Sequence, residues 1–380
     1  MPGPEAFLMM RSRRDEWLAA LAGLVEHESP SLDKPRLDAL AAKLADRFRA
    51  IGGSVEVVAN PDGGNHVLAR FFDDAPGPKP ALVIGHFDTV WPLGTLAAMP
   101  FRVEGAKAFG PGVFDMKASL TEAEFALDAL RKLGRRPPSP VIVLLTSDEE
   151  IGSPTSRALI EATARGCEYA LVLEPPLPGG SLKTARKGVG QFTIEVEGKA
   201  AHAGVEPRKG ASALLELAHM IVDLHALTDH DAGVSVNVGV ASGGTTPNVV
   251  PALAIARVDV RAVTLDQAAA LERSIRSLKP HLSGTRLTIR GGFNRPPMER
   301  TAAVARLFER AREVGRTIGL DLGEGSTGGG SDGNFTAALG VPTLDGLGIA
   351  GSGAHASHEQ VDLDSIPERT ALLAALLAHL

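Results

Sequence analysis

Two adjacent carboxylates, Glu149 and Glu150, close the apolar stretch "VIVLLTSDEE". Like charges repel, and a low-dielectric setting strengthens the repulsion, so this pair needs a positive partner. Two other apolar runs end in similar chemistry, because "PALVIGH" ends at His86 and "EYALVLEP" carries Glu174. Imidazoles and carboxylates bind divalent transition metals. We therefore predict a metal site in which one glutamate of the pair binds a cation and the other lies beside it as a base.

Further candidates lie close to these positions in the sequence. Asp88 in "GHFDTV" is two residues beyond His86, which on an extended segment puts both side chains on the same side. That spacing suits a carboxylate that orients a metal-bound imidazole. Asp115 in "GPGVFDMKAS" precedes a helix, where backbone donors stabilise an anion, and "GAHASHEQV" supplies His355 and His358. A single acid at a strand end is more often a solvated loop residue, but this combination is hard to explain by coincidence.

The segments between these residues alternate between strands and helices. Helices are expected over residues 13–24, 34–50 and 116–134, and apolar strands end at His86, at the glutamate pair and at Glu174. This alternation predicts a three-layer α/β domain with a largely parallel sheet. In open α/β sheets ligands bind outside the carboxyl ends of the strands. Three strand ends should therefore bring their metal-type side chains together.

The pattern changes near Lys187. From there the chain reads as strand, helix, two strands, helix and strand, the order of a small ferredoxin-like α+β domain. We predict that residues 186–294 form an inserted domain, and that residues 1–185 and 295–380 form the catalytic domain.

Composition narrows the class of protein. The chain has 380 residues, long for one core, and its 44% apolar and 22% charged residues are those of an ordinary globular protein. Its net charge of −6 offers no footprint for nucleic acid, and no apolar run is long enough to span a membrane. The single cysteine, Cys167, excludes an internal disulfide. Because the N-terminal segment lacks the order of a secretory signal, we expect a cytoplasmic protein. The glycine-rich "GEGSTGGGSDGN" lacks the lysine and spacing of a phosphate-binding loop.

Seven ordered motifs together resemble the dinuclear zinc aminoacylase and carboxypeptidase family: "GHFDTVWP", "GPGVFDMKAS", "TSDEEIGS", "LVLEP", "GKAAHAG", "TTPNVVP" and "HASHE". This family includes bacterial glutamate carboxypeptidase, acetylornithine deacetylase and succinyl-diaminopimelate desuccinylase. The resemblance runs from about Ala81 to the C-terminus. It implies a three-layer zinc-peptidase catalytic domain with an inserted ferredoxin-like lid and dimerisation domain.

The resemblance also implies roles for individual residues in a site with two zinc ions. One ion would be held by His86 and Glu174, the other by Glu150 and His355, with Asp115 bridging them and Glu149 as general base and acid. His355 is favoured over His358 because its spacing from Glu359 fits the family, although His358 occupies a position where the family often has Asn. A carboxylate-rich site also accepts cobalt or manganese.

Three residues of the inserted domain complete the implied site. In similar enzymes the counterpart of His202 comes from the partner subunit and polarises the scissile carbonyl, which implies a homodimer. Asn248 and Arg290 match positions that hold the substrate's carboxylate, and Arg is suited to this because its planar fork binds a carboxylate bidentately. Arg290 could equally be a solvated charge at a strand end.

The sequence therefore predicts a zinc-dependent metallopeptidase or amidohydrolase that cleaves an amide bond to a C-terminal, glutamate-like amino acid. Its substrate would be a small molecule or peptide with a free carboxylate. An N-acyl-amino-acid deacetylase or desuccinylase, or a dipeptidase, would share every catalytic residue and differ in the pocket. The non-enzyme alternative is a metal-free binding or assembly protein that keeps the fold.

Overall fold

The computed structural model describes residues 2–380, and the chain forms two compact units. The first unit runs from the N-terminus to Ala185 and includes Arg300–Ser326 and Ser331–Leu380. The second unit consists of Arg186–Glu299 together with Thr327–Gly330. None of the helices within residues 2–380 combines the length and apolar character needed to cross a membrane.

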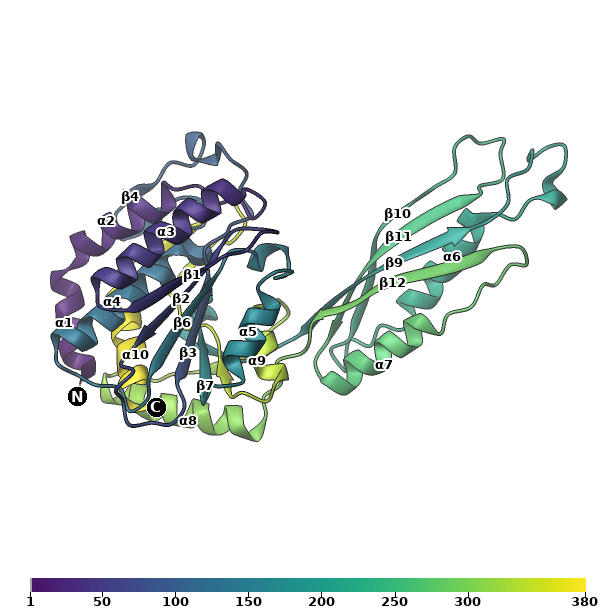
Figure 1. Cartoon of the computed structure of the whole chain (residues 1–380). Helices are drawn as coiled ribbons and strands as arrows, with labels where there is room; N and C mark the ends of the chain where they lie inside the picture. Colours follow the sequence, from purple (N-terminus) through teal and green to yellow (C-terminus); the bar gives the residue numbers. More distant parts are fainter. Residues whose placement is uncertain (1) are drawn as a thin grey trace. The chain divides into compact units, whose positions relative to one another are not determined.

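A six-stranded mixed sheet forms the centre of the first unit (Figure 1). Its strands, in spatial order, are β1 (Ser54–Val58), β2 (His66–Phe71), β6 (Val141–Thr146), β3 (Ala81–His86), β7 (Tyr169–Val172) and β14 (Thr343–Leu344). The last four strands are parallel to one another, and β1 and β2 are antiparallel to their neighbours. The carboxyl ends of β3, β6 and β7 therefore lie at one edge of the sheet.

Helices cover both faces of this sheet, which confirms the predicted three-layer α/β class (Figure 1). Alternate residues of β6 belong to two separate cores: Val143 packs with α3, α4 and α10, and Ile142 packs with α5 and α9. A strand that is buried on both faces must be apolar throughout, as "VIVLL" is. The helices are α1 (Pro2–Ser12), α2 (Arg14–Val25), α3 (Lys34–Ala50), α4 (Ala118–Lys132), α5 (Arg157–Ala164), α8 (Ala302–Thr317), α9 (Gly333–Ala338) and α10 (Ile366–His379).

Two small sheets complete the strands outside the second unit. One has the order β15 (Gly351–Ser352), β16 (Gln360–Asp362), β5 (Lys107–Phe109) and β4 (Arg102–Glu104). The other pairs β8 (Leu182–Arg186) with β13 (Glu324–Thr327). Because β16 pairs with β5, the segment that carries His355 lies beside the loop that leads to Asp115.

The second unit is a four-stranded antiparallel sheet with both helices on one face (Figure 1). In chain order its elements are β9 (Gly188–Glu197), α6 (Ala213–His225), β10 (Ser235–Gly243), β11 (Leu253–Ala262), α7 (Leu265–Arg276) and β12 (Arg286–Arg295). This order is the ferredoxin-like order that the sequence predicts. Alternation along β9 explains the layering, because Phe192, Ile194 and Val196 are buried against the helices while the residues between them face outward.

A carboxyl group without a hydrogen-bond partner among residues 2–380 lies in the core of the first unit, at Glu122 on α4. Burial raises the pKa of Glu122 from 4.5 to about 8. Between these two values the unfolded chain releases the proton while the folded protein keeps it, so rising pH favours unfolding. Below about pH 4.5 both states carry the proton and the effect vanishes.

Glu122→Gln should therefore stabilise the protein at pH 8.5 by about 2 to 4 kcal/mol relative to its effect at pH 4.5, because the amide has no proton to lose. Urea unfolding of both proteins at the two pH values measures this difference. If the difference in the free energy of unfolding between variant and wild type is the same at both pH values, Glu122 does not have a raised pKa in the folded protein.

Candidate metal centre

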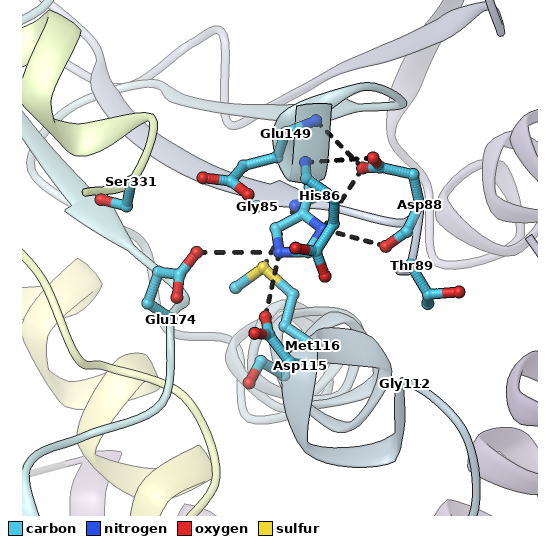
Figure 2. A network of polar contacts seen from close by, with 12 residues as sticks. Gly85, His86, Asp88, Thr89, Gly112, Asp115, Met116, Glu149, Glu174 and Ser331 are labelled. Atoms are coloured by element: carbon cyan, nitrogen blue, oxygen red, sulfur yellow. Dashed lines mark hydrogen bonds and ion pairs between the residues drawn. The ribbon is translucent and has the colours of Figure 1, made fainter. Parts of the chain in front are cut away.

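His86, the last residue of β3, is at the centre of the site (Figure 2). Its side chain is buried, and Nδ1 lies 3.1 Å from the backbone carbonyl oxygen of Asp88 and 3.3 Å from Asp88 Oδ1. On the other side of the ring, Nε2 lies 3.1 Å from Asp115 Oδ1 and 3.7 Å from Glu174 Oε1. We infer that Nδ1 carries the proton and donates it toward Asp88. This leaves Nε2 as the nitrogen that can bind a metal.

Asp88 connects the end of β3 to the turn that carries the two glutamates. Its Oδ1 accepts a hydrogen bond from the Glu149 backbone N–H at 3.1 Å, and its Oδ2 accepts one from the Glu150 N–H at 3.2 Å. The Ser31 hydroxyl donates to Asp88 Oδ2 at 2.7 Å. One fully buried carboxylate thus orients the imidazole and fixes the backbone of both glutamates.

The strands end slightly earlier than the sequence suggests. β6 ends at Thr146, the partner of His86 in the ladder, and the glutamates lie in a 3₁₀ turn, Glu149–Ile151. β7 ends at Val172, two residues before Glu174. β6 ends where its neighbour β3 also ends, because Thr146 pairs with His86, the last residue of β3.

Asp115 lies in a tight turn, Val113–Lys117, whose backbone is held by Glu359. The buried carboxylate of Glu359 accepts hydrogen bonds from the N–H groups of Gly112 at 2.9 Å, Phe114 at 2.9 Å and Asp115 at 3.0 Å. The indole N–H of Trp91 is a fourth donor, at 2.8 Å. Burial nevertheless raises the pKa of Glu359 above its usual value. Sequence reasoning used Glu359 only as a spacing landmark for the histidine before it.

His355 completes the cluster from the C-terminal part of the chain. Its Nε2 lies 3.1 Å from Glu150 Oε2 and 3.4 Å from Asp115 Oδ2, and these two carboxylates raise the pKa of His355 to about 10. Its backbone is left-handed, with φ of 61°. His358, the alternative ligand, has no such contact with the cluster within the described chain.

The electrostatics of the cluster require positive charge. Although burial opposes ionisation, hydrogen bonds with Asp115 and Asp88 raise the pKa of His86 well above its usual value. Burial also opposes ionisation of Asp115, but the two imidazoles lower its pKa. Burial raises the pKa of Glu150, whose Oε1 is buried without a hydrogen-bond partner in residues 2–380. A divalent cation bound by nitrogen and oxygen donors would satisfy all of these groups, so the residues fit a metal.

Two overlapping groups of potential ligands meet at His86. One consists of His86, Glu149 and Glu174, and the other of His86, Asp115 and Glu150, with ligand atoms within 4.8 Å of one another in each group. No other triad of His, Cys, Asp or Glu in residues 2–380 meets this criterion. In Figure 2 the carboxylates of Glu149, Glu174 and Asp115 lie on the side of the His86 ring away from Asp88. The structure thus gathers all the candidate ligands of the first unit in one cluster.

The candidate residues of the second unit lie in two places. His202 and Asn248 are neighbours, because His202 pairs with Val249 and the Ala203 N–H donates to the Asn248 carbonyl oxygen at 2.9 Å. The backbone N–H groups of Gly204 and Val205 each donate to His202 Nδ1 at 3.1 Å. Arg290 is on β12 instead, where its guanidinium lies 3.2 Å from the carboxylate of Glu195. It lines a concavity of about 690 Å³ on the open face of the sheet, which neither His202 nor Asn248 lines.

Glu359→Gln should weaken metal binding at least tenfold, because the amide NH₂ group opposes the N–H donors that fix the turn of Asp115. Competition with a chromophoric chelator measures the affinity. Trp91→Phe is the matched control, since it removes one donor and leaves the three backbone hydrogen bonds; we expect a smaller loss. Equal affinity of the Gln variant and the wild type would exclude this positioning role.

The arrangement of fold and site is that of a metal-dependent hydrolase, and comparison with known sequences agrees. The sequence model of Peptidase family M20/M25/M40 matches residues 82–379, and the chain belongs to this family. It is 34% identical over 315 residues to carboxypeptidase G2 of Pseudomonas sp. (strain RS-16), covering 80% of this chain and 74% of that protein. It is 27% identical over 364 residues to succinyl-diaminopimelate desuccinylase of Dechloromonas aromatica, covering 89% and 92%.

A solved structure gives the same result for the fold. The crystal structure of aminopeptidase PepT from Bacillus cereus superposes with a TM-score of 0.79 at 20% identity, covering 96% of this chain and 98% of that one. The predicted family and fold class are therefore confirmed, and the protein is a metallopeptidase-type hydrolase.

Proposed function

We propose that the protein is a zinc-dependent carboxypeptidase or amidohydrolase that releases a C-terminal, glutamate-like amino acid from an amide. The observation that carries this proposal is the cluster around His86. The imidazole of His86 belongs to two groups of potential ligands, one with Glu149 and Glu174 and the other with Asp115 and Glu150. The similarity to carboxypeptidase G2 supports the direction of cleavage. The substrate is proposed to be a small molecule or peptide with a free carboxylate.

Two metal ions are proposed, zinc with cobalt or manganese as alternatives. When bound, they polarise the scissile carbonyl and lower the pKa of water. The residues proposed to hold them are His86, Asp115, Glu150, Glu174 and His355. Glu149 is proposed to take the proton of the attacking water and deliver it to the leaving nitrogen. Asp88 orients the imidazole of His86 through the contact at Nδ1.

The second unit is proposed to supply groups that recognise the substrate. Because two backbone N–H groups donate to His202 Nδ1, we infer that the neutral ring carries its proton on Nε2. That N–H can donate to the oxyanion that develops on the scissile carbonyl. Asn248 and Arg290 are proposed to bind the substrate's carboxylate. The alternative role for Arg290 is that of a solvated surface charge, and its ion pair with Glu195 is compatible with either role.

A homodimer formed through the second unit is part of this proposal. Leu215 and Val222, seven residues apart on α6, are 51% and 69% exposed, and Val240 on the edge strand β10 is 56% exposed. The exposed apolar face of α6 and an exposed edge strand each suit a self-complementary interface, and Val240 lies on the open face of the sheet, opposite α6. Cytoplasmic location likewise stays a prediction.

Mixing two inactive variants tests whether His202 acts in the partner's site. A His202→Ala protein and a Glu149→Ala protein should regain up to about a quarter of wild-type activity after subunit exchange, because half of the molecules are heterodimers with one intact site of two. Size-exclusion chromatography with light scattering should show the dimer. No recovery in a dimer that does exchange subunits would exclude action in trans.

The test of the proposed function is hydrolysis of a substrate panel by the zinc-loaded protein, with and without a chelator. The panel contains folyl-glutamate, N-acyl amino acids, N-succinylated amino acids and dipeptides. Chelator-sensitive release of a C-terminal amino acid from an acyl-glutamate would support the proposal. Turnover of N-acetyl or N-succinyl substrates alone would favour the deacetylase or desuccinylase alternative, which the similarity to the Dechloromonas desuccinylase keeps open. A zinc content near zero would favour the metal-free binding protein.

A further inference from the structure

Arg369 is a buried cation that lies away from the ligand cluster. It is on α10, its exposed fraction is 2%, and its guanidinium donates three hydrogen bonds to backbone carbonyls. Nε donates to the Gly348 oxygen at 2.9 Å, Nη2 to the Gly346 oxygen at 2.6 Å and Nη1 to the Gly180 oxygen at 3.0 Å. Burying a guanidinium is costly unless its donors are satisfied, and a planar fork holds several acceptors in fixed directions.

The segment that Arg369 binds lies against the chain that presents Glu174. The Leu347 N–H donates to the Val172 oxygen at 3.1 Å, and the Gly348 N–H donates to the Glu174 oxygen at 3.0 Å. These two bonds continue the parallel pairing of β14 with β7 past the end of the ladder. The Glu174 backbone is therefore held by Gly348, whose own carbonyl oxygen accepts a hydrogen bond from Arg369.

The guanidinium also binds the loop that follows Glu174 in the sequence. Gly180 belongs to a turn, Pro178–Gly180, that follows Glu174 after a short proline-containing stretch. One side chain thus binds both the segment beside Glu174 and the loop after it. Relaxation of either segment would shift the carboxylate of Glu174, whose Oε1 lies 3.7 Å from His86 Nε2.

A second contact holds the same segment from the side of α4. The Ser119 hydroxyl accepts a hydrogen bond from the Ile349 N–H at 3.3 Å. There is no room for a side chain at residue 348, because a Cβ there would lie 2.1 Å from Ser119 Oγ and 2.4 Å from the Leu173 oxygen. Residues 346–349 are therefore fixed between α4 and α10, and glycine at 348 permits this close approach.

We infer that Arg369 is a positioning residue of the metal site, which fixes Glu174 through the backbone of residues 346–348. Ser119 supports the same segment from the opposite side. The inference rests on the proposed metal site. Groups that orient a metal ligand through hydrogen bonds typically change metal affinity 10- to 100-fold when they are removed.

The test compares Arg369→Lys with Arg47→Lys in the full-length protein. Arg369→Lys keeps the charge and removes the fork. Arg47→Lys is the matched control, because Arg47 forms a half-buried pair with Glu124 of α4, with Nε 2.6 Å from Glu124 Oε2, and has no hydrogen bond to residues 346–348. Cobalt affinity is measured by competition with a chelator, the visible spectrum of bound cobalt reports the ligand geometry, and thermal unfolding reports stability.

Arg369→Lys should lower the affinity for one of the two cobalt ions at least tenfold and change the visible spectrum of that ion. Arg47→Lys should lower the melting temperature but leave the cobalt affinity and the spectrum unchanged. Ser119→Ala is a milder change and should lower the affinity for the same ion about two- to fivefold. If the Arg369 variant does not fold, the Ser119 variant serves as the test of the inference. Wild-type cobalt affinity in a variant that is merely less stable would overturn the inference. Failure of the wild-type protein to bind cobalt would instead overturn the proposed metal site.

Discussion

Replacing Glu149 by alanine should lower kcat by about two to four orders of magnitude while leaving both metal ions bound, because a general base contributes about that much to the rate. The variant tests a specific ambiguity of the site. The Glu149 carboxylate belongs to one of the two ligand groups, with His86 and Glu174, so its position alone would also suit a metal ligand. A base and a ligand differ in what their removal does to metal content.

Glu150→Ala is the matched control for this experiment, because the two glutamates are adjacent in the same turn and both backbone N–H groups bind Asp88. Glu150 Oε2 lies 3.1 Å from His355 Nε2, so the Glu150→Ala variant should lose one metal ion together with its activity. Metal content by mass spectrometry and kcat on the best panel substrate are measured for both variants. Loss of a metal ion from the Glu149 variant would make it a ligand, and unchanged turnover would remove it from the mechanism.

The sequence alone predicts those residues of the candidate metal cluster whose positions follow from a local pattern. His86 follows an apolar run because the centre of a parallel sheet is buried on both faces, and a polar residue at its end marks the edge where ligands bind. The same logic finds Glu150 and Glu174 even though β6 and β7 end two to four residues earlier. Asp115 and His355 lie in irregular turns, and they were found through their motifs and not through periodicity.

The residues that sequence reasoning missed act through the backbone of distant segments. Glu359 binds N–H groups more than two hundred positions away, and Arg369 binds carbonyls on two separate loops. No periodicity records which peptide groups a folded chain leaves without a partner. An Arg in a helix and a Glu before a short strand therefore look like surface charges until the tertiary structure shows that both are buried.

Asp115→Asn should release both metal ions, and it is the sharpest test of the proposed bridging role. The two carboxylate oxygens of Asp115 lie near different imidazoles. Oδ1 is 3.1 Å from His86 Nε2, and Oδ2 is 3.4 Å from His355 Nε2. Asparagine keeps the shape but loses the charge and one of the two acceptors, so neither ion keeps a full ligand set.

The turn itself should survive this substitution, because Glu359 holds it through backbone N–H groups that asparagine also has. Glu174→Gln is the comparison, since it changes a carboxylate proposed to contact one ion only. After gel filtration in metal-free buffer, the Asp115 variant should retain close to no metal and the Glu174 variant about one ion for each chain. If the Asp115 variant also retains about one ion for each chain, Asp115 contacts one ion only and does not bridge the two.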